Sequence, residues 1–178
     1  MNYRRALVIR FGGLGDILLA TPTIRALRAT FPGMEIDVVV GDGMADAIAG
    51  HPCVRNVYVF DKRLANRRPN VFVPFLRKLA RARYDLVVNL HPSAKSYVMA
   101  YATRAPHQLT FRKNSQIDPA TGRVTHAIDD FAKVLKMAGC PPPASPDLDF
   151  IIPDEARRNL DDLLRLNTLV GPAPPCGR

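Results

Sequence analysis

The sequence has no long apolar stretch. Its 178 residues contain no apolar run of about 18 residues, the length that crosses a bilayer as a helix, and its first residues lack the apolar core of a secretory signal peptide. These absences predict a chain that neither spans a membrane nor is secreted, so we expect it in the cytoplasm. With 47% hydrophobic residues the chain can bury a sizeable core, and its length favours one globular domain.

Cysteine and histidine are also scarce. The three cysteines, Cys53, Cys140 and Cys176, are odd in number and far apart, which excludes a disulfide framework and a clustered set of metal ligands. The four histidines never stand one helical turn apart, the spacing by which two imidazoles share a metal ion. We therefore expect free thiols and no metal site.

The most informative stretch lies near the N-terminus. Residues 6–9 are predicted as a buried parallel strand, because an apolar, partly β-branched run is followed at once by a turn signal. Gly12, Gly13 and Gly15 come next and remove the side chains that would keep a ligand from the backbone. Apolar residues then recur at helical spacing. This order is typical of an α/β ligand-binding loop, here with Asp16 at its rim.

This loop does not match the common phosphate-binding fingerprints. A P-loop ends in Gly-Lys-Ser/Thr, whereas Asp16 follows Gly15, and the glycines do not have the Gly-x-Gly-x-x-Gly spacing of a dinucleotide loop. A carboxylate at a helix start would also repel a phosphate. Asp16 is better suited to accept a proton or a hydroxyl hydrogen bond. The alternative is that it serves only as a helix N-cap, for which aspartate is among the preferred residues.

Strand and helix patterns alternate along the chain. Strands are predicted at residues 6–10, 35–40, 57–60, 86–90 and 107–111, and helices at 16–30, 44–50, 72–83, 93–103 and 126–138. The alternation predicts an α/β fold, a Rossmann-like open parallel sheet with helices on both faces. Pro22 conflicts with a continuous first helix, because a proline in a helix interior removes a hydrogen bond and clashes with the preceding turn. We expect either a kink there or a later helix start that Thr21 caps.

Several motifs together resemble glycosyltransferase family nine, the ADP-heptose:lipopolysaccharide heptosyltransferases. The first and most specific is RFGGLGDILLATP at residues 10–22, with IRAL at 24–27 and FP at 31–32. Three later segments agree with the family in order and spacing: IDVVVG at 36–41, YDLVVNLH at 84–91 with Lys95 and Ser96 behind it, and His126 with Ala127. The resemblance covers residues 5–140, most of the chain.

The resemblance implies a fold, a reaction and a division into domains. Residues 1–140 would form the acceptor-side, N-terminal domain of a GT-B glycosyltransferase. Residues 141–178 would form a proline-rich linker and the start of an interdomain connection, with the C-terminal donor domain absent. The implied reaction is an inverting transfer of heptose from ADP-heptose to the lipopolysaccharide inner core, with no cofactor. The sugar nucleotide would then bind through the missing domain.

The resemblance also implies roles within the glycine loop. Asp16 would be the general base that takes the proton of the acceptor hydroxyl. Gly12 and Gly13 would let the acceptor sugar approach the backbone, and Arg10, together with the basic region at residues 62–113, would hold acceptor phosphates or carboxylates. Family members often have serine or alanine in place of Gly12 or Gly13, so the identity of the acceptor stays open.

Three further residues are assigned to acceptor binding. His91 follows the fourth predicted strand, at the edge where open α/β sheets bind ligands, and Lys95 stands near the start of the next helix. His126 opens the last predicted helix and would face the cleft by resemblance. Without the resemblance, His91 is equally well an ordinary turn residue, and a helix-start histidine such as His126 is more often structural.

Positive charge is concentrated in one segment. Residues 62–113 contain 12 Lys or Arg against one acid, Asp85, while the rest of the chain is slightly negative within a total of +9. Such a segment attracts a polyanion. The resemblance suggests an acidic lipopolysaccharide core or a lipid-linked glycan acceptor, with peripheral contact to the inner membrane. Nucleic acid is disfavoured, because Phe72 and Phe75 fall on the apolar side of a predicted helix and are poorly placed for base stacking.

Two alternative interpretations of the charge and the motifs stay open. The basic segment is equally compatible with a merely solvated face. The chain is also compatible with a non-catalytic module that binds an anionic glycan or a protein partner through a basic cleft.

Overall fold

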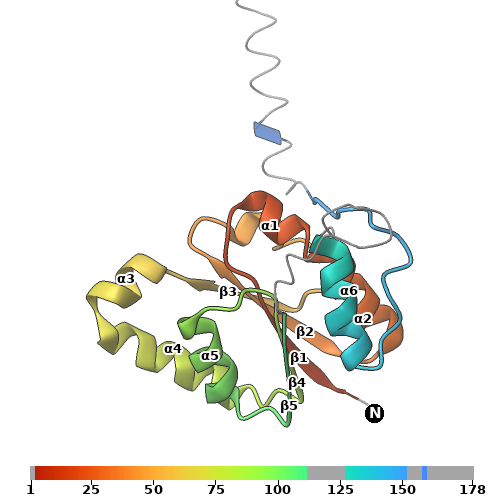
Figure 1. Ribbon diagram of the computed structural model, residues 1–178. Coiled ribbons are helices and arrows are strands. Elements are labelled where there is room, and N and C mark those ends of the chain that lie inside the picture. The colour runs from red at the N-terminus through yellow and green to blue at the C-terminus, as the bar shows by residue number, and fades with distance from the viewer. Residues whose placement is uncertain (1–2, 112–126, 152–157, 160–178) are drawn as a thin grey trace, which may run out of the picture.

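The computed structural model describes residues 3–111, 127–151 and 158–159, and a five-stranded parallel sheet forms its centre (Figure 1). The strands are β1 (Arg5–Ile9), β2 (Glu35–Gly41), β3 (Asn56–Phe60), β4 (Leu86–Asn89) and β5 (His107–Thr110). Their spatial order is β3-β2-β1-β4-β5, and every neighbouring pair is parallel. The chain therefore leaves the central strand β1 toward one side of the sheet and later returns to extend the other side, as in doubly wound folds.

Helices cover both faces of this sheet. They are α1 (Leu14–Leu18), α2 (Thr21–Thr30), α3 (Lys62–Arg67), α4 (Pro69–Arg81), α5 (Ala94–Thr103) and α6 (Ala127–Met137), with a single 3-10 turn, η1, at Ala45–Ala47. In Figure 1, α2 and α6 lie on one side of the sheet and α4 and α5 on the other. The α/β, Rossmann-like arrangement expected from the sequence is confirmed. None of the described helices has both the length and the apolar character needed to cross a membrane.

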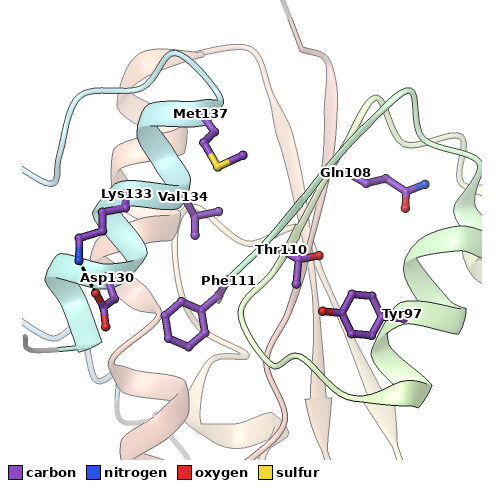
Figure 2. Close-up of a pocket in the computed structure, with 8 residues that line it drawn as sticks. All are labelled: Tyr97, Gln108, Thr110, Phe111, Asp130, Lys133, Val134 and Met137. Carbon is purple, nitrogen blue, oxygen red and sulfur yellow. Dashed lines mark hydrogen bonds and ion pairs between the residues drawn. The ribbon is translucent and has the colours of Figure 1, made fainter. Parts of the chain in front are cut away.

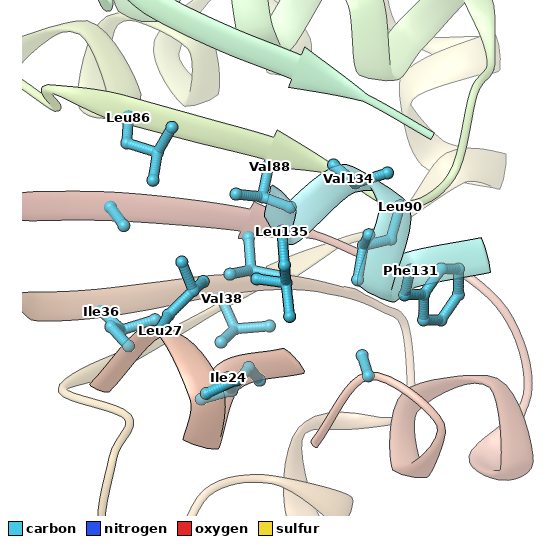
Figure 3. Packing of buried hydrophobic residues seen from close by; sticks show 14 of the residues in the cluster. Ile24, Leu27, Ile36, Val38, Leu86, Val88, Leu90, Phe131, Val134 and Leu135 are labelled. Atoms are coloured by element: carbon cyan, nitrogen blue, oxygen red, sulfur yellow. The ribbon is translucent and has the colours of Figure 1, made fainter. Parts of the chain in front are cut away.

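The core is divided between the two faces. Figure 3 shows the side of α2 and α6, where Ile24 and Phe131 pack with Val38 and Val88 of the sheet. On the other side, Leu7 and neighbouring strand residues pack under α4 and α5. Successive strand residues point to opposite faces, so a strand covered on both sides is apolar throughout, which explains the continuous apolar runs.

The predicted helix at residues 16–30 is two helices. The helix α1 ends at Leu18 and α2 begins at Thr21, so Pro22 lies in the first turn of α2, where a missing N–H costs nothing. The Thr21 hydroxyl donates to the carbonyl of Leu18 (2.8 Å). A second helix that starts at Thr21 is therefore confirmed over a kink, although Ala20, and not Thr21, occupies the N-cap position.

Two other helix predictions were wrong in extent. The predicted helix at 44–50 is only the turn η1, because a segment so short, with Gly43 and Gly50 at its ends, cannot offset the cost of nucleating a helix. Conversely, α3 was not predicted. Its start is fixed by Asp61, whose carboxylate accepts the Leu64 N–H (2.8 Å). The helix α4 begins at Pro69, earlier than the predicted residue 72.

A buried carboxylate lies toward the amino ends of the strands. The Asp37 side chain is fully buried in β2 and accepts hydrogen bonds from the Arg55 guanidinium (3.0 and 2.7 Å), the Asn56 amide (3.0 Å) and the Tyr84 hydroxyl (2.7 Å). Burial, together with donation to Asp37, raises the pKa of Tyr84 well above its usual range. We call these four residues the Asp37 cluster; they join β2, β3 and the segment before β4.

The segment 145–151, called here the strap, runs against α2. The Arg25 guanidinium donates to both carboxylate oxygens of Asp149 (2.6 and 2.7 Å) and to the Ser145 carbonyl (3.0 Å). The Asp149 N–H donates to the Thr21 hydroxyl (2.9 Å), and His51 Nε2 lies 3.2 Å from the Asp149 carboxylate. The strap is therefore tied to the domain by side chains, and its residues form no strand. The division at residue 140 stays a prediction.

Candidate functional site

The glycine loop leaves the carboxyl end of β1 in a backbone conformation that needs glycine. Gly12 has φ +148°, a region that other residues rarely adopt. A Cβ at this position would lie 2.2 Å from Oδ2 of Asp16. Gly13 is different, because its φ of −77° is ordinary and a Cβ there would meet no atom within 4 Å. Gly12 thus makes room for the Asp16 carboxylate, and Gly13 leaves the approach to the loop open.

The Asp16 carboxylate lies in the first turn of α1 and is held from two sides. Its Oδ1 accepts a hydrogen bond from Nη2 of Arg10 (2.6 Å), and its Oδ2 accepts the backbone N–H of Gly13 (3.2 Å). Gly13 occupies the N-cap position of α1, so Asp16 is not the N-cap itself but bonds back to it from the third helical position. Its side chain is nevertheless 44% exposed. The carboxylate is therefore fixed in place and still reachable.

Arg10 makes its hydrogen bonds to the protein. Its side chain is only 12% exposed, and besides Asp16 Oδ1 it donates to the carbonyls of Leu90 (2.6 Å) and Asp16 (3.1 Å). The guanidinium also lies 5.2 Å from the ring centroid of Phe131 in α6. Arg10 thus joins the ends of β1 and β4 to α1 and orients the Asp16 carboxylate. Its expected contact with acceptor anions stays a prediction.

His91 and Lys95 line a pocket beside the glycine loop. The pocket has a volume of about 260 Å³, and its walls are formed by Phe11, Phe60, Lys62, His91, Ser93, Ala94 and Lys95. The Phe11 ring lies 5.3 Å from both the His91 and the Phe60 rings, so aromatic groups form one side. The Lys95 ammonium lies 3.4 Å from the Lys62 carbonyl and 5.7 Å from the Phe60 ring centroid. The pocket is apolar on one wall and cationic on another.

The electrostatics of this pocket favour an anion. Burial lowers the pKa of His91, and the positive charges of Arg10 and Lys62 lower it further. His91 is therefore neutral at neutral pH, and the charge of the pocket comes from Lys62 and Lys95. Two ammonium groups near a neutral imidazole suit a carboxylate or phosphate group of a ligand.

The sequence reasoning missed part of this pocket. His91 and Lys95 were expected at the sheet edge, and Lys62 begins the basic region expected to hold the acceptor, but Phe11 and Phe60 were not assigned to the site. Phe60 could have been predicted to lie near His91, because Phe60 ends β3 and parallel strands end at one edge of the sheet, where β1 and β4 also end. His126 and Cys176 lie outside the described residues. Cys53 and Cys140 are free thiols. Within the described part of the chain, no three His, Cys, Asp or Glu side chains gather as metal ligands.

A larger cavity lies between α5, β5 and α6 (Figure 2). Its volume is about 670 Å³, and it is lined by Tyr97, Gln108, Thr110, Phe111, Asp130, Lys133, Val134 and Met137. Asp130 is buried and accepts a hydrogen bond from Lys133 (2.7 Å), as the dashed line in Figure 2 marks. Phe111 packs edge-on against Phe131, the ring under the Arg10 guanidinium. Packing thus links one wall of this cavity to Arg10, through Phe111 and Phe131.

The two neighbouring glycines give a matched test of the loop. We expect Gly12→Ala to lower the free energy of unfolding by about 1–3 kcal/mol, because alanine is strained at this φ and its Cβ displaces the Asp16 carboxylate. Gly13→Ala should change it by less than about 1 kcal/mol, because the lower entropy of the unfolded chain with alanine, worth about 0.4–1 kcal/mol, opposes the weaker preference of alanine for an N-cap position. Urea denaturation of both variants measures the difference. Equal stabilities would contradict the steric role of Gly12.

Two known proteins with sequences similar to this chain are both heptosyltransferases. No family model matches the sequence. The chain is 28% identical to lipopolysaccharide heptosyltransferase 1 of Pseudomonas aeruginosa over 109 residues, which is 57% of this chain and 31% of that protein. It is 30% identical to lipopolysaccharide heptosyltransferase 3 of Escherichia coli over 78 residues, 43% of this chain and 23% of that protein.

Solved structures with a fold similar to this chain also include glycosyltransferases. A glycosyl transferase family 9 structure from Veillonella parvula matches with a TM-score of 0.78 and 24% identity, covering 93% of this chain and 50% of that one. The E. coli heptosyltransferase WaaC with ADP-2-deoxy-2-fluoro heptose matches with a TM-score of 0.63 and 19% identity, over 83% of this chain and 52% of that one. The chain thus spans about a third or less of the curated relatives and half of these structures. Over that part, the chain is similar in sequence to two lipopolysaccharide heptosyltransferases and similar in fold to a family 9 glycosyltransferase.

Proposed function

We propose that this chain provides the acceptor-binding half of an inverting glycosyltransferase, one that moves heptose from an ADP-activated donor to an acidic lipopolysaccharide core acceptor. One observation carries the proposal: the Asp16 carboxylate is anchored by Arg10 and Gly13, is 44% exposed, and stands at the carboxyl end of the central strand. That edge is where open α/β sheets bind their ligands. The names of the relatives supply the sugar and the acceptor.

The proposed chemistry assigns one step to this chain. The acceptor hydroxyl donates a hydrogen bond to Asp16, and the carboxylate takes its proton as the oxygen attacks the anomeric carbon of the donor. A bond forms between that oxygen and the anomeric carbon, and the bond to the diphosphate breaks, so ADP leaves. Arg10 occupies Oδ1 at 2.6 Å, which leaves Oδ2, with its longer bond to Gly13, for the hydroxyl. Proton transfer of this kind contributes roughly 10²–10⁴ in rate.

The pocket beside the loop would hold the acceptor. Lys62 and Lys95 would bind a carboxylate or phosphate of the core, and the rings of Phe11 and Phe60 would pack against a sugar face. The open space at Gly13 would let the acceptor reach Asp16. In this proposal no cofactor or metal takes part, the donor binds mainly to the half that the chain does not include, and the protein acts on the cytoplasmic side of the inner membrane.

Acceptor binding to the 178-residue chain tests this proposal. Calorimetry with a delipidated, acidic core oligosaccharide should show binding that weakens with salt, because the contacts are charged. Lys62→Gln combined with Lys95→Gln should weaken it about tenfold or more, since hydrogen bonds to charged groups are worth roughly 1.5–3 kcal/mol each. Arg77→Gln with Arg81→Gln removes the same charge from the exposed side of α4 and is the matched control. Equal losses in both pairs would contradict a built pocket and leave a solvated basic face.

A second candidate function is glycan binding without catalysis. Because the chain spans only part of its relatives, a module that binds an anionic glycan without catalysis would use the same pocket. The two functions separate at Asp16. A binding module needs the lysines but not a proton acceptor, whereas transfer needs both.

A further inference from the structure

The cavity between α5, β5 and α6 has no part in the proposed transfer reaction. Its volume of about 670 Å³ is in the range of small-molecule sites. The strand β5 is the outermost strand of the described sheet and contributes Gln108 and Thr110, which alternate onto one face of the strand. One face of α6 forms the opposite wall, through residues spaced at i, i+3, i+4 and i+7: Asp130, Lys133, Val134 and Met137. Regular elements therefore form the walls of this cavity.

Several polar groups on these walls have unused hydrogen-bonding capacity. The Asp130 side chain is only 8% exposed, and within the described chain its carboxylate accepts a hydrogen bond from Lys133 alone (2.7 Å). The Gln108 amide nitrogen donates to a backbone carbonyl (3.2 Å), which leaves its oxygen as an acceptor. The hydroxyls of Tyr97 and Thr110 make no hydrogen bond to the described residues. Buried polar groups normally have partners, so this set indicates a ligand with several hydroxyl groups.

The charges in the cavity cancel. Among its lining residues, Asp130 is the acid and Lys133 the base, and the two are paired. An anionic ligand would be repelled by the carboxylate, and a cationic one by the ammonium. A neutral ligand can donate to the free carboxylate oxygen and leave the pair intact. In this respect the cavity differs from the pocket at His91, whose charge is positive.

An apolar floor and an aromatic wall complete the cavity. Phe111 and Val134 are buried, at 8% and 4% exposed, and the Phe111 ring packs edge-on against Phe131 at 5.1 Å between centroids. The Tyr97 ring remains 49% exposed, and Figure 2 shows Tyr97 and Phe111 on either side of Thr110. Rings held in this way offer flat apolar surface, which suits the C–H face of a sugar ring.

We propose that this cavity binds a neutral saccharide. Sugar hydroxyls donate to Asp130 and Gln108 and exchange hydrogen bonds with Tyr97 and Thr110, while one C–H face of the sugar packs on the aromatic groups. Apolar walls with a few convergent polar groups are the usual composition of such sites. The cavity shares no lining residue with the pocket at His91, and binding here does not depend on the transfer reaction.

Saturation-transfer NMR of the 178-residue chain tests the proposal. The probes are the methyl glycosides of glucose, galactose and mannose at millimolar concentration. At least one should receive saturation, strongest at the C–H protons of one ring face, and its Kd should not change with salt because the glycosides are uncharged. Absence of saturation transfer to all three glycosides would overturn the proposal.

Matched variants locate the bound sugar. Tyr97→Phe removes one hydroxyl and should raise the Kd of the glycoside about threefold to tenfold, whereas Tyr101→Phe, on the same helix and 81% exposed, should not. Asp130→Asn should raise it about tenfold or more, because hydrogen bonds to a charged group are stronger. Asp129→Asn, an exposed acid in the same turn of α6, is its control. Equal affinities in Tyr97→Phe and Tyr101→Phe would contradict binding in this cavity, even if Asp130→Asn fails to fold.

A further pair of substitutions separates this cavity from the proposed acceptor pocket. Lys62→Gln with Lys95→Gln should leave glycoside binding unchanged, because neither lysine lines the cavity. A loss of glycoside binding in that double variant would assign the sugar to the pocket at His91 and overturn the second site. Conversely, the acidic core oligosaccharide tests the pocket at His91 through its charge and salt dependence. Failure of glycoside binding therefore leaves the proposed function standing.

Discussion

Asp16→Asn should lower the rate of sugar transfer by about 10²-fold or more. Asparagine keeps the size of the side chain and can still accept the Arg10 hydrogen bond through its amide oxygen, but it cannot take the proton of the acceptor hydroxyl. The loss should appear in kcat, because the carboxylate acts on the acceptor in the transition state. Since the chain spans about half of its solved relatives, the assay needs it joined to a donor-binding half from one of them.

Binding measurements separate this loss from misfolding. The variant should bind the core oligosaccharide and the donor with affinities close to those of the parent, and its thermal unfolding should shift little. Near-full transfer activity in Asp16→Asn would leave Asp16 with only its structural part, the bond to the N-cap Gly13. His91 would then be the next base to test, because its lowered pKa keeps it able to accept a proton at neutral pH. His126 would follow it.

Arg55→Met should be strongly destabilising, although Arg55 lies far along the strands from the proposed chemistry. It removes two hydrogen bonds from the fully buried Asp37 carboxylate, which keeps those from Asn56 and Tyr84. Breaking a buried ion pair from one side costs roughly 3–5 kcal/mol. Because the Arg55 side chain is 32% exposed and water can enter, we expect about 3 kcal/mol. At about 2–4 °C per kcal/mol, Tm should fall by roughly 6–12 °C.

A second substitution distinguishes the charge from the lost packing. Adding Asp37→Asn to Arg55→Met removes the unpaired carboxylate, so the double variant should recover much of the lost stability. Glu35→Gln removes an exposed partner of the same arginine and should cost less than about 1 kcal/mol. If Arg55→Met is no worse than Glu35→Gln, the Asp37 cluster does not depend on its arginine.

Local signals were enough for much of the fold. The strand at β1 is apolar on both faces, and the glycines that follow it mark a turn regardless of the rest of the chain. Pro22 indicated a helix boundary, and the structure places one there. The helix α3 was missed although Asp61 and Pro69 were readable start signals for α3 and α4, because its polar sequence KRLANR has no apolar stripe.

Contacts between distant segments were not readable from the sequence. Tyr84 stands 47 residues from Asp37, and Asp149 stands 124 residues from Arg25, so neither pair leaves a local pattern. The same holds for the site. Gly12 and Asp16 could be proposed as site residues because their signals are neighbours in the chain, whereas the pocket requires β1, β3 and β4 to end at one edge.

The position of the Asp37 cluster has a consequence for how such a domain can diversify. The cluster joins β2, β3 and the segment before β4 toward the amino ends of the strands, while Asp16 and the pocket lie beyond the carboxyl ends. The interactions that hold the sheet are thus separate from the loops of the candidate site. Under the proposed function, exchanging Lys62 or Lys95 would select a different acceptor without weakening the scaffold, so substrate range could change over evolution while the fold keeps its stability.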